Sequence, residues 1–92
     1  MRKVTPPIYR FYPEMWSSDR RLVLFVCQDG NARWSFCVTR TTLESLCYGA
    51  EPEQAFERCR SAIYRAATLC MLRGRPPARS RVLSAQDIGD AG

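Results

Sequence analysis

The clearest hydrophobic pattern in this chain lies on either side of Asp29-Gly30. In both flanking segments, apolar side chains recur at every second position, which is the period of a strand with one buried face. Asp-Gly is also a preferred pair for a two-residue hairpin turn. The pattern therefore predicts a β-hairpin with strands at 21–28 and 32–38.

A two-residue turn at Asp29-Gly30 pairs Phe25 with Trp34 and Val23 with Phe36. Burial of one face is expected to fix the pairing, because a slip of one residue would mix the two faces. The face with the larger apolar side chains is the expected core face, and it carries Val23, Phe25, Cys27, Ala32, Trp34, Phe36 and Val38.

The hairpin runs directly into a first helix, which we expect at about 40–48. Thr39 is the favoured N-cap, because its hydroxyl can accept a hydrogen bond from a free backbone N–H of the first turn. Thr41 and Glu44 offer a competing capping box two residues later. Gly49 is a suitable stop.

A second and longer helix is expected at 52–73. Proline suits the first helical position, and Gly74 suits the position just past the end. Apolar residues at helical spacing form the expected core stripe, namely Phe56, Cys59, Ile63, Ala66, Ala67 and Cys70. The opposite side carries Glu57, Arg58, Ser61, Arg65 and Thr68.

The remaining segments are short. Residues 8–12 and 81–84 are strand candidates, and residues 84–88 resemble a single capped helical turn. Met15 and Trp16 are apolar enough to contact the core. The two ends, 1–7 and 89–92, are expected to be loose.

These elements predict one α+β domain over 1–92. A chain of 92 residues can bury one modest core. The expected architecture has two layers, with a small antiparallel sheet made of the hairpin and the two short strands. The two helices cover the aromatic face of that sheet.

The second face of the hairpin is still half apolar, since Leu22, Leu24 and Val26 lie on it. Something must cover such a face, and Leu69 and Leu72 on the outer side of the long helix add to the exposed apolar surface. We therefore expect a partner surface. Twofold self-association is the commonest form of assembly for soluble proteins.

Charge adds a second candidate partner. The net charge is +5, and arginines at 73, 75, 79 and 81 form a basic loop in which no compensating acid is evident. One interpretation is that Arg73, Arg75, Arg79 and Arg81 contact an anion or the phosphates of a nucleic acid. The other is a solvated loop that complements the C-terminus of the long helix.

Catalytic chemistry has little support in this sequence. The chain has no histidine, which removes the commonest general base and the usual nucleophile pairs. It has no phosphate-binding glycine motif, and we expect no cofactor and no metal. A cysteine activated by an arginine is the one catalytic arrangement left open. The sequence thus favours a non-enzymatic protein.

The five cysteines are widely spaced and odd in number. That pattern argues against a disulfide framework or a zinc knuckle, and favours small apolar side chains in a reducing compartment. The longest apolar run, residues 22–27, is too short to span a bilayer. We expect a cytoplasmic protein with no membrane contact.

Arg60 is the charged residue that most needs a partner. It lies at the margin of the core stripe, between Phe56 and Ile63. A charge at such a position is expected to form an ion pair. Glu44 or Asp87 could supply the carboxylate, in a structural rather than a functional role.

The chain resembles the bacterial domain-of-unknown-function family 1488 over about residues 20–88. The matching positions are Cys37-Val38-Thr39-Arg40, Leu43-Glu44, Leu46, Phe56, Arg60, Ile63, Ala67, Gly74, Val82-Leu83 and Asp87-Ile88. The Pro76-Pro77 loop and the many cysteines depart from the family pattern. The resemblance implies a compact α+β fold in a bacterial cytoplasmic protein, and it supplies no activity, cofactor or catalytic residue.

The leading hypothesis is therefore a non-catalytic interaction or accessory module that can form a homodimer. The alternative is a nucleic-acid-associated regulator that uses the arginine loop.

Overall fold

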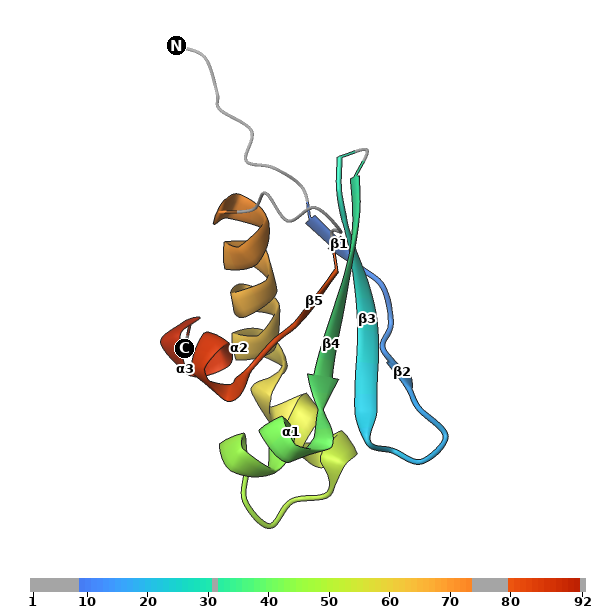
Figure 1. Cartoon of the computed structure of the whole chain (residues 1–92), viewed down its shortest axis with the longest axis vertical. Helices are drawn as coiled ribbons and strands as arrows, with labels where there is room; N and C mark the ends of the chain where they lie inside the picture. Colours follow the sequence, from blue (N-terminus) through green and yellow to red (C-terminus); the bar gives the residue numbers. More distant parts are fainter. Residues whose placement is uncertain (1–8, 31, 74–79, 92) are drawn as a thin grey trace.

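The computed structural model describes residues 9–30, 32–73 and 80–91. One sheet and three helices form two layers, with all three helices on the same side of the sheet (Figure 1). This is the expected α+β architecture. The strands are β1 (Tyr9–Phe11), β2 (Met15–Trp16), β3 (Leu22–Asp29), β4 (Ala32–Thr39) and β5 (Ser80–Val82). The helices are α1 (Arg40–Leu46), α2 (Pro52–Arg73) and α3 (Ala85–Ala91).

The sheet is mixed rather than antiparallel as predicted. Its order is β1-β3-β4-β5, and β2 also pairs with β3. Strands β1 to β4 pair antiparallel, but β5 runs parallel to β4. The reason is the crossover: α1 and α2 lie between β4 and β5 in the chain, and such a helical connection returns the chain in the same direction.

The hairpin has the predicted faces but a different register. Phe25 pairs with Phe36 instead of Trp34, and Asp29 pairs with Ala32, so Asp29 belongs to the strand rather than to the turn. Gly30 has φ +60°, a left-handed conformation that suits the first residue of a tight hairpin turn. Because each partner moves by two positions, every side chain keeps its face.

The inner face of the sheet and the helices enclose the core. Six hairpin residues are buried there, and Phe25 lies at the centre, with its ring 5.5 Å from that of Phe36 and 5.2 Å from that of Tyr64. The six are Val23, Phe25, Cys27, Trp34, Phe36 and Val38, all expected on this face; Ala32 is half-buried. The other elements contribute Leu43, Ala55, Phe56, Ile63, Ala66, Ala67, Met71, Leu83 and Ile88.

The two predicted helices form as expected. Thr39 is the N-cap of α1, because its hydroxyl accepts a hydrogen bond from the backbone N–H of Thr42 at 3.2 Å. The long helix α2 begins at Pro52 and ends at Arg73. Its buried stripe includes Met71, whereas the cysteines of the predicted stripe, Cys59 and Cys70, are only half-buried.

The C-terminal end departs most from expectation. A single turn was predicted at 84–88, with 89–92 loose, but α3 continues through Ala91 and forms a third covering helix. Ile88 is 1 % exposed, so its burial against the core stabilises the longer helix. The first seven residues, also expected to be loose, lie outside the described residues.

Candidate functional site

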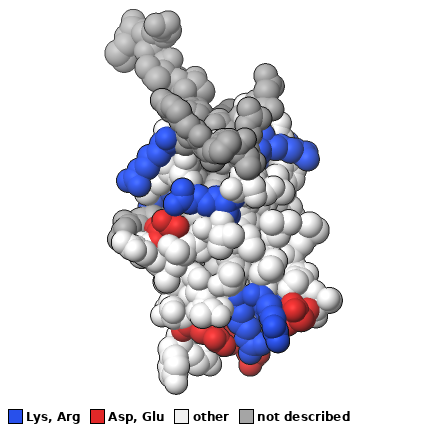
Figure 2. Space-filling model, viewed as in Figure 1, with Lys and Arg blue, Asp and Glu red and all other residues white. Residues whose placement is uncertain are grey.

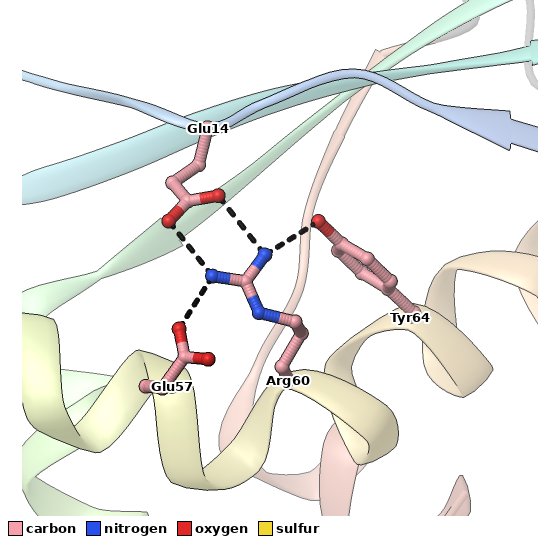
Figure 3. A network of polar contacts seen from close by, with 4 residues as sticks. All are labelled: Glu14, Glu57, Arg60 and Tyr64. Atoms are coloured by element: carbon pink, nitrogen blue, oxygen red, sulfur yellow. Dashed lines mark hydrogen bonds and ion pairs between the residues drawn. The ribbon is translucent and has the colours of Figure 1, made fainter.

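Arg60 lies at the centre of a polar network on the side of α2 that meets the β1–β2 segment (Figure 3). Its guanidinium donates two hydrogen bonds to the carboxylate of Glu14, at 3.0 and 2.9 Å. It donates a third to Glu57 at 2.7 Å and a fourth to the Tyr64 hydroxyl at 3.0 Å. The Phe56 ring lies beneath it, with 5.0 Å between Cζ and the ring centroid.

The network corrects the predicted partners of Arg60. An ion pair is present, but its acids are Glu14 and Glu57 rather than Glu44 or Asp87. Glu44 pairs with Arg40 on its own helix, at 3.3 Å. Sequence reasoning missed Glu14 because it lies between two very short strands, in a segment with no strong pattern.

Partial burial makes this ion pair stronger than a surface pair. The side chains of Arg60 and Glu14 are 31 % and 22 % exposed. The hydrogen bonds from Arg60 lower the pKa of the Glu14 carboxyl, and the hydrogen bonds to Glu14 and Glu57 raise the pKa of Arg60. The network satisfies the charge that sequence reasoning placed at the core margin. It joins the β1–β2 segment to α2.

The predicted anion-contact arginines are only partly described. Arg73 is exposed at the end of α2, and Arg75 and Arg79 lie outside the described residues. Arg81 pairs with Asp87 at 3.5 Å, so the expectation that no acid compensates this loop is wrong at Arg81. Whether these arginines contact an anion stays a prediction.

Asp87 also closes the start of α3. Its carboxylate accepts a hydrogen bond from the Ser84 backbone N–H at 3.0 Å, and its own N–H donates to the Ser84 hydroxyl at 3.1 Å. This reciprocal pair is a capping box. The Ser84 N–H is the main cause of the lowered pKa of Asp87, and Arg81 adds to it.

The second face of the sheet, here called the outer face, consists of the side chains that point away from the helices. On β3 and β4 these are Leu22, Leu24, Val26, Gln28, Arg33, Ser35, Cys37 and Thr39, which alternate with the buried set. Among the described residues no helix covers them (Figure 1). The outer face is therefore the side of the sheet that the described helices leave open.

One apolar row crosses the outer face. Met15 pairs with Leu24, Leu24 with Cys37, and Cys37 with Val82. Cross-strand partners project from the same side of a sheet, so these four side chains are neighbours across β2, β3, β4 and β5. Met15 is 61 % and Val82 59 % exposed. We call Met15, Leu24, Cys37 and Val82 the outer row.

The hairpin end of the outer face is polar and positive. Arg10 and Arg33 are the β1 and β4 partners of Gln28 on β3. The Tyr12 hydroxyl donates to the Gln28 side-chain oxygen at 2.9 Å, and the Arg33 guanidinium lies 5.5 Å from the centroid of the Tyr12 ring. We call Arg10, Tyr12, Gln28 and Arg33 the hairpin-end cluster.

The cysteines are all free thiols. The one arrangement that resembles an activated cysteine is at Cys47, whose sulfur accepts a hydrogen bond from Arg58 at 3.4 Å. Neighbouring Cys59 has a raised pKa, mainly through burial. Burial likewise raises the pKa values of the Cys37 and Cys70 thiols, which favours the protonated form.

A pocket of about 420 Å³ is lined by Glu44, Tyr48, Gly49 and Ala50. Among the described residues, no group of three or more acidic, cysteine or histidine side chains could hold a metal ion. No helix in the described ranges is long and apolar enough to cross a bilayer.

Comparison with known proteins gives one result. Searches of curated proteins and of solved structures give no match. The model of the family described as "Protein of unknown function (DUF1488)" matches residues 11–80, which include the hairpin, α1, α2 and the residues of the Arg60 network. The chain belongs to this family of unknown function, DUF1488.

Proposed function

We propose that this protein is a non-catalytic interaction module that pairs with a second copy of itself through the outer face of its sheet. The outer row carries this proposal, because it presents contiguous apolar side chains that the described helices do not cover. Exposed apolar patches of this kind are typical of protein interfaces. The half-buried Leu24 and Cys37 lie between the exposed Met15 and Val82, so the row already has a packed centre.

The size of the face sets the expected strength of association. Strands β3 and β4 each have eight residues, so the sheet face measures roughly 25 by 20 Å, or about 500 Å². A standard stable interface buries about 800 Å² on each partner. The proposed dimer is therefore weak and forms at high micromolar rather than nanomolar concentrations.

Charge favours a twofold, antiparallel arrangement of the two sheets. Arg10 and Arg33 lie at the hairpin end of the outer face, and the apolar Leu22 lies at the opposite end of β3. If two copies meet through the outer row with their strands antiparallel, the arginine pairs of the two copies lie at opposite ends of the contact, beyond the row, and do not oppose each other. A parallel arrangement would oppose four arginines, which is destabilising.

Two observations support the non-catalytic part of the proposal. The chain contains no histidine. The thiols of Cys37, Cys59 and Cys70 have raised pKa values, which makes them poor nucleophiles at neutral pH. The proposal includes a bacterial cytoplasmic setting, in which such thiols stay reduced. The nucleic-acid alternative stays a prediction, and the pairing of Arg81 with Asp87 weakens its basis.

The experiment is multi-angle light scattering over a concentration series, with two matched variants. Val82 and Leu72 are almost equally exposed, at 59 % and 61 %, but Val82 belongs to the outer row and Leu72 to helix α2. We expect the wild-type average mass to rise with concentration, Val82→Asp to stay monomeric, and Leu72→Asp to behave as wild type. A wild type that stays monomeric at every concentration contradicts the proposal, as does loss of association in Leu72→Asp alone.

A further inference from the structure

The hairpin-end cluster is separate from the outer row. Gln28 lies four residues along β3 from Leu24, a distance of about 13 Å. The apolar row and the cluster therefore occupy different zones of the outer face. Contact between two copies through the row does not use the guanidinium groups of Arg10 and Arg33, so the cluster needs an explanation of its own.

Arg33 is held in a defined orientation. Its guanidinium lies over the Tyr12 ring, and Tyr12 is fixed by its hydroxyl bond to Gln28 and by a backbone hydrogen bond from its N–H to the Val26 carbonyl at 2.9 Å. Gln28 in turn donates to the Gly30 carbonyl at 3.0 Å. This chain of contacts orders the side chains beneath Arg33 before any ligand arrives.

Stacking uses only the flat side of the guanidinium. The N–H groups of arginine lie in the plane of the group, so a guanidinium on a ring still presents its donors to an anion. Among the side chains that the structure describes, no carboxylate pairs with Arg33 or Arg10, in contrast to the paired Arg40, Arg60 and Arg81. Figure 2 shows basic side chains (blue) at the upper right, in the region of the hairpin tip in Figure 1, with no red atoms beside them in that view.

The second arginine extends the site across the sheet. Arg10 and Arg33 both neighbour Gln28, one on each side, so their backbones are about 10 Å apart, or two strand spacings. Two cations at that separation fit an anionic chain better than a single small anion. The polar Gln28 between them adds an amide to the same surface.

We propose that the hairpin-end cluster binds an extended acidic segment of a partner protein, with a carboxylate on Arg33 and a second one near Arg10. The residue types of the two central strands, β3 and β4, favour a protein partner over single-stranded nucleic acid. Sheets that bind single strands stack bases on aromatic side chains. Here the outer-face residues of β3 and β4 include no aromatic residue, and the Tyr12 ring of the cluster is already covered by the guanidinium of Arg33. The site does not rest on the proposed self-association.

The test is fluorescence anisotropy with a labelled peptide in which glutamate alternates with alanine, at low salt and at protein concentrations too low for pairing. We expect saturable binding that weakens with salt. Arg33→Ala should weaken binding about tenfold or more, because it removes a charge-assisted donor pair. Arg33→Lys keeps the positive charge and the fold but lacks the paired N–H donors of the guanidinium. Its affinity for the peptide should therefore lie between those of the wild type and Arg33→Ala.

The control is Arg21→Ala. Arg21 has the same charge and an 81 % exposed side chain, but it pairs with Asp19 at 3.8 Å and lies just before β3, at the end far from the hairpin turn. Its removal should change the affinity less than twofold. Equal losses in Arg33→Ala and Arg21→Ala would overturn the proposal, since they would mean attraction by net charge alone. Binding of a labelled single-stranded oligonucleotide that depends on Arg33, with no binding of the peptide, would overturn it in favour of nucleic acid.

Discussion

The two faces of the sheet are made from alternate residues of the same strands, yet they differ sharply in burial. On the inner face, Phe36 and Val38 are fully buried. On the outer face, Leu22 is 38 % exposed, and Val82 of β5 is 59 % exposed. All four side chains are apolar, so hydrophobicity alone does not explain why two are buried and two are exposed. Three helices complete the core on one side, so the apolar residues on the other side gain less burial on folding.

The sharpest test of this difference is truncation on each face. Phe36→Ala removes a buried ring that contacts both Phe25 and Trp34, and it should cost about 3–5 kcal/mol in the free energy of unfolding. Val82→Ala on the outer face should cost less than about 0.5 kcal/mol. Urea unfolding followed by tryptophan fluorescence measures both. Similar losses at the two positions would contradict the claim that the inner face contributes more to the free energy of unfolding than the outer face.

The Arg60 network joins the edge of the sheet to α2, so it should have an intermediate effect. Glu14→Gln keeps the shape of the side chain but removes its charge, and we expect a loss of about 1–2 kcal/mol. Glu57→Gln is the matched control, because the Glu57 side chain is 70 % exposed and its pair with Arg60 is open to solvent. A larger loss in Glu57→Gln than in Glu14→Gln would contradict the greater contribution of the half-buried Glu14 pair.

The same carboxylate predicts a pH dependence. Folding lowers the pKa of Glu14 below its ordinary value of about 4.5, so its contribution is complete above that pH and is lost as the pH falls through the lower, folded-state pKa. The difference in unfolding free energy between wild type and Glu14→Gln should be constant from pH 7 to about 5 and shrink below about 4.5. Asp87 also has a lowered pKa, but it is present in both proteins and cancels.

Thr39 is the last residue of β4 and lies on the outer face, but it also has a role in the helix that follows. Its hydroxyl caps α1, so Thr39→Ala should cost about 1 kcal/mol. Thr39→Ser retains the hydroxyl and should recover most of that loss. Thermal unfolding of Thr39→Ala and Thr39→Ser measures the two losses of stability. A Thr39→Ser protein as unstable as Thr39→Ala would show that the methyl group, and not the cap, matters.

The sequence predicted best what depends on neighbouring residues. The strand period predicted the two faces of the hairpin. Thr39 itself indicated the cap of α1, and Pro52 and Gly74 in the sequence indicated the limits of α2. The hairpin register was wrong by two, because both registers bury the same residues; Asp29 lacks the positive φ that a type I′ turn at Asp29-Gly30 requires.

Contacts between distant segments could not be predicted. The partner of Arg60 is 46 residues away at Glu14, in a segment without a helical or strand pattern. The parallel pairing of β5 depends on the crossover through α2, and the length of α3 depends on burial of Ile88. The hairpin-end cluster brings together four residues from β1, β3, β4 and the turn after β1. The strand register places Arg10, Gln28 and Arg33 on one face, and the contacts of Tyr12 with Gln28 and Arg33 add it to them.

The proposed pairing of outer faces is tested most directly at Cys37. This thiol lies in the outer row near the centre of the sheet, so it should be close to the twofold axis and to its copy in the partner. Packed sheets are about 10 Å apart, too far for a disulfide but within reach of a short bismaleimide. The reaction is run at mildly alkaline pH, because burial raises the pKa of the Cys37 thiol. We predict a covalent dimer that becomes more abundant with protein concentration and disappears in Cys37→Ser. A dimer that persists in Cys37→Ser, or no dimer at high concentration, would contradict the proposed interface.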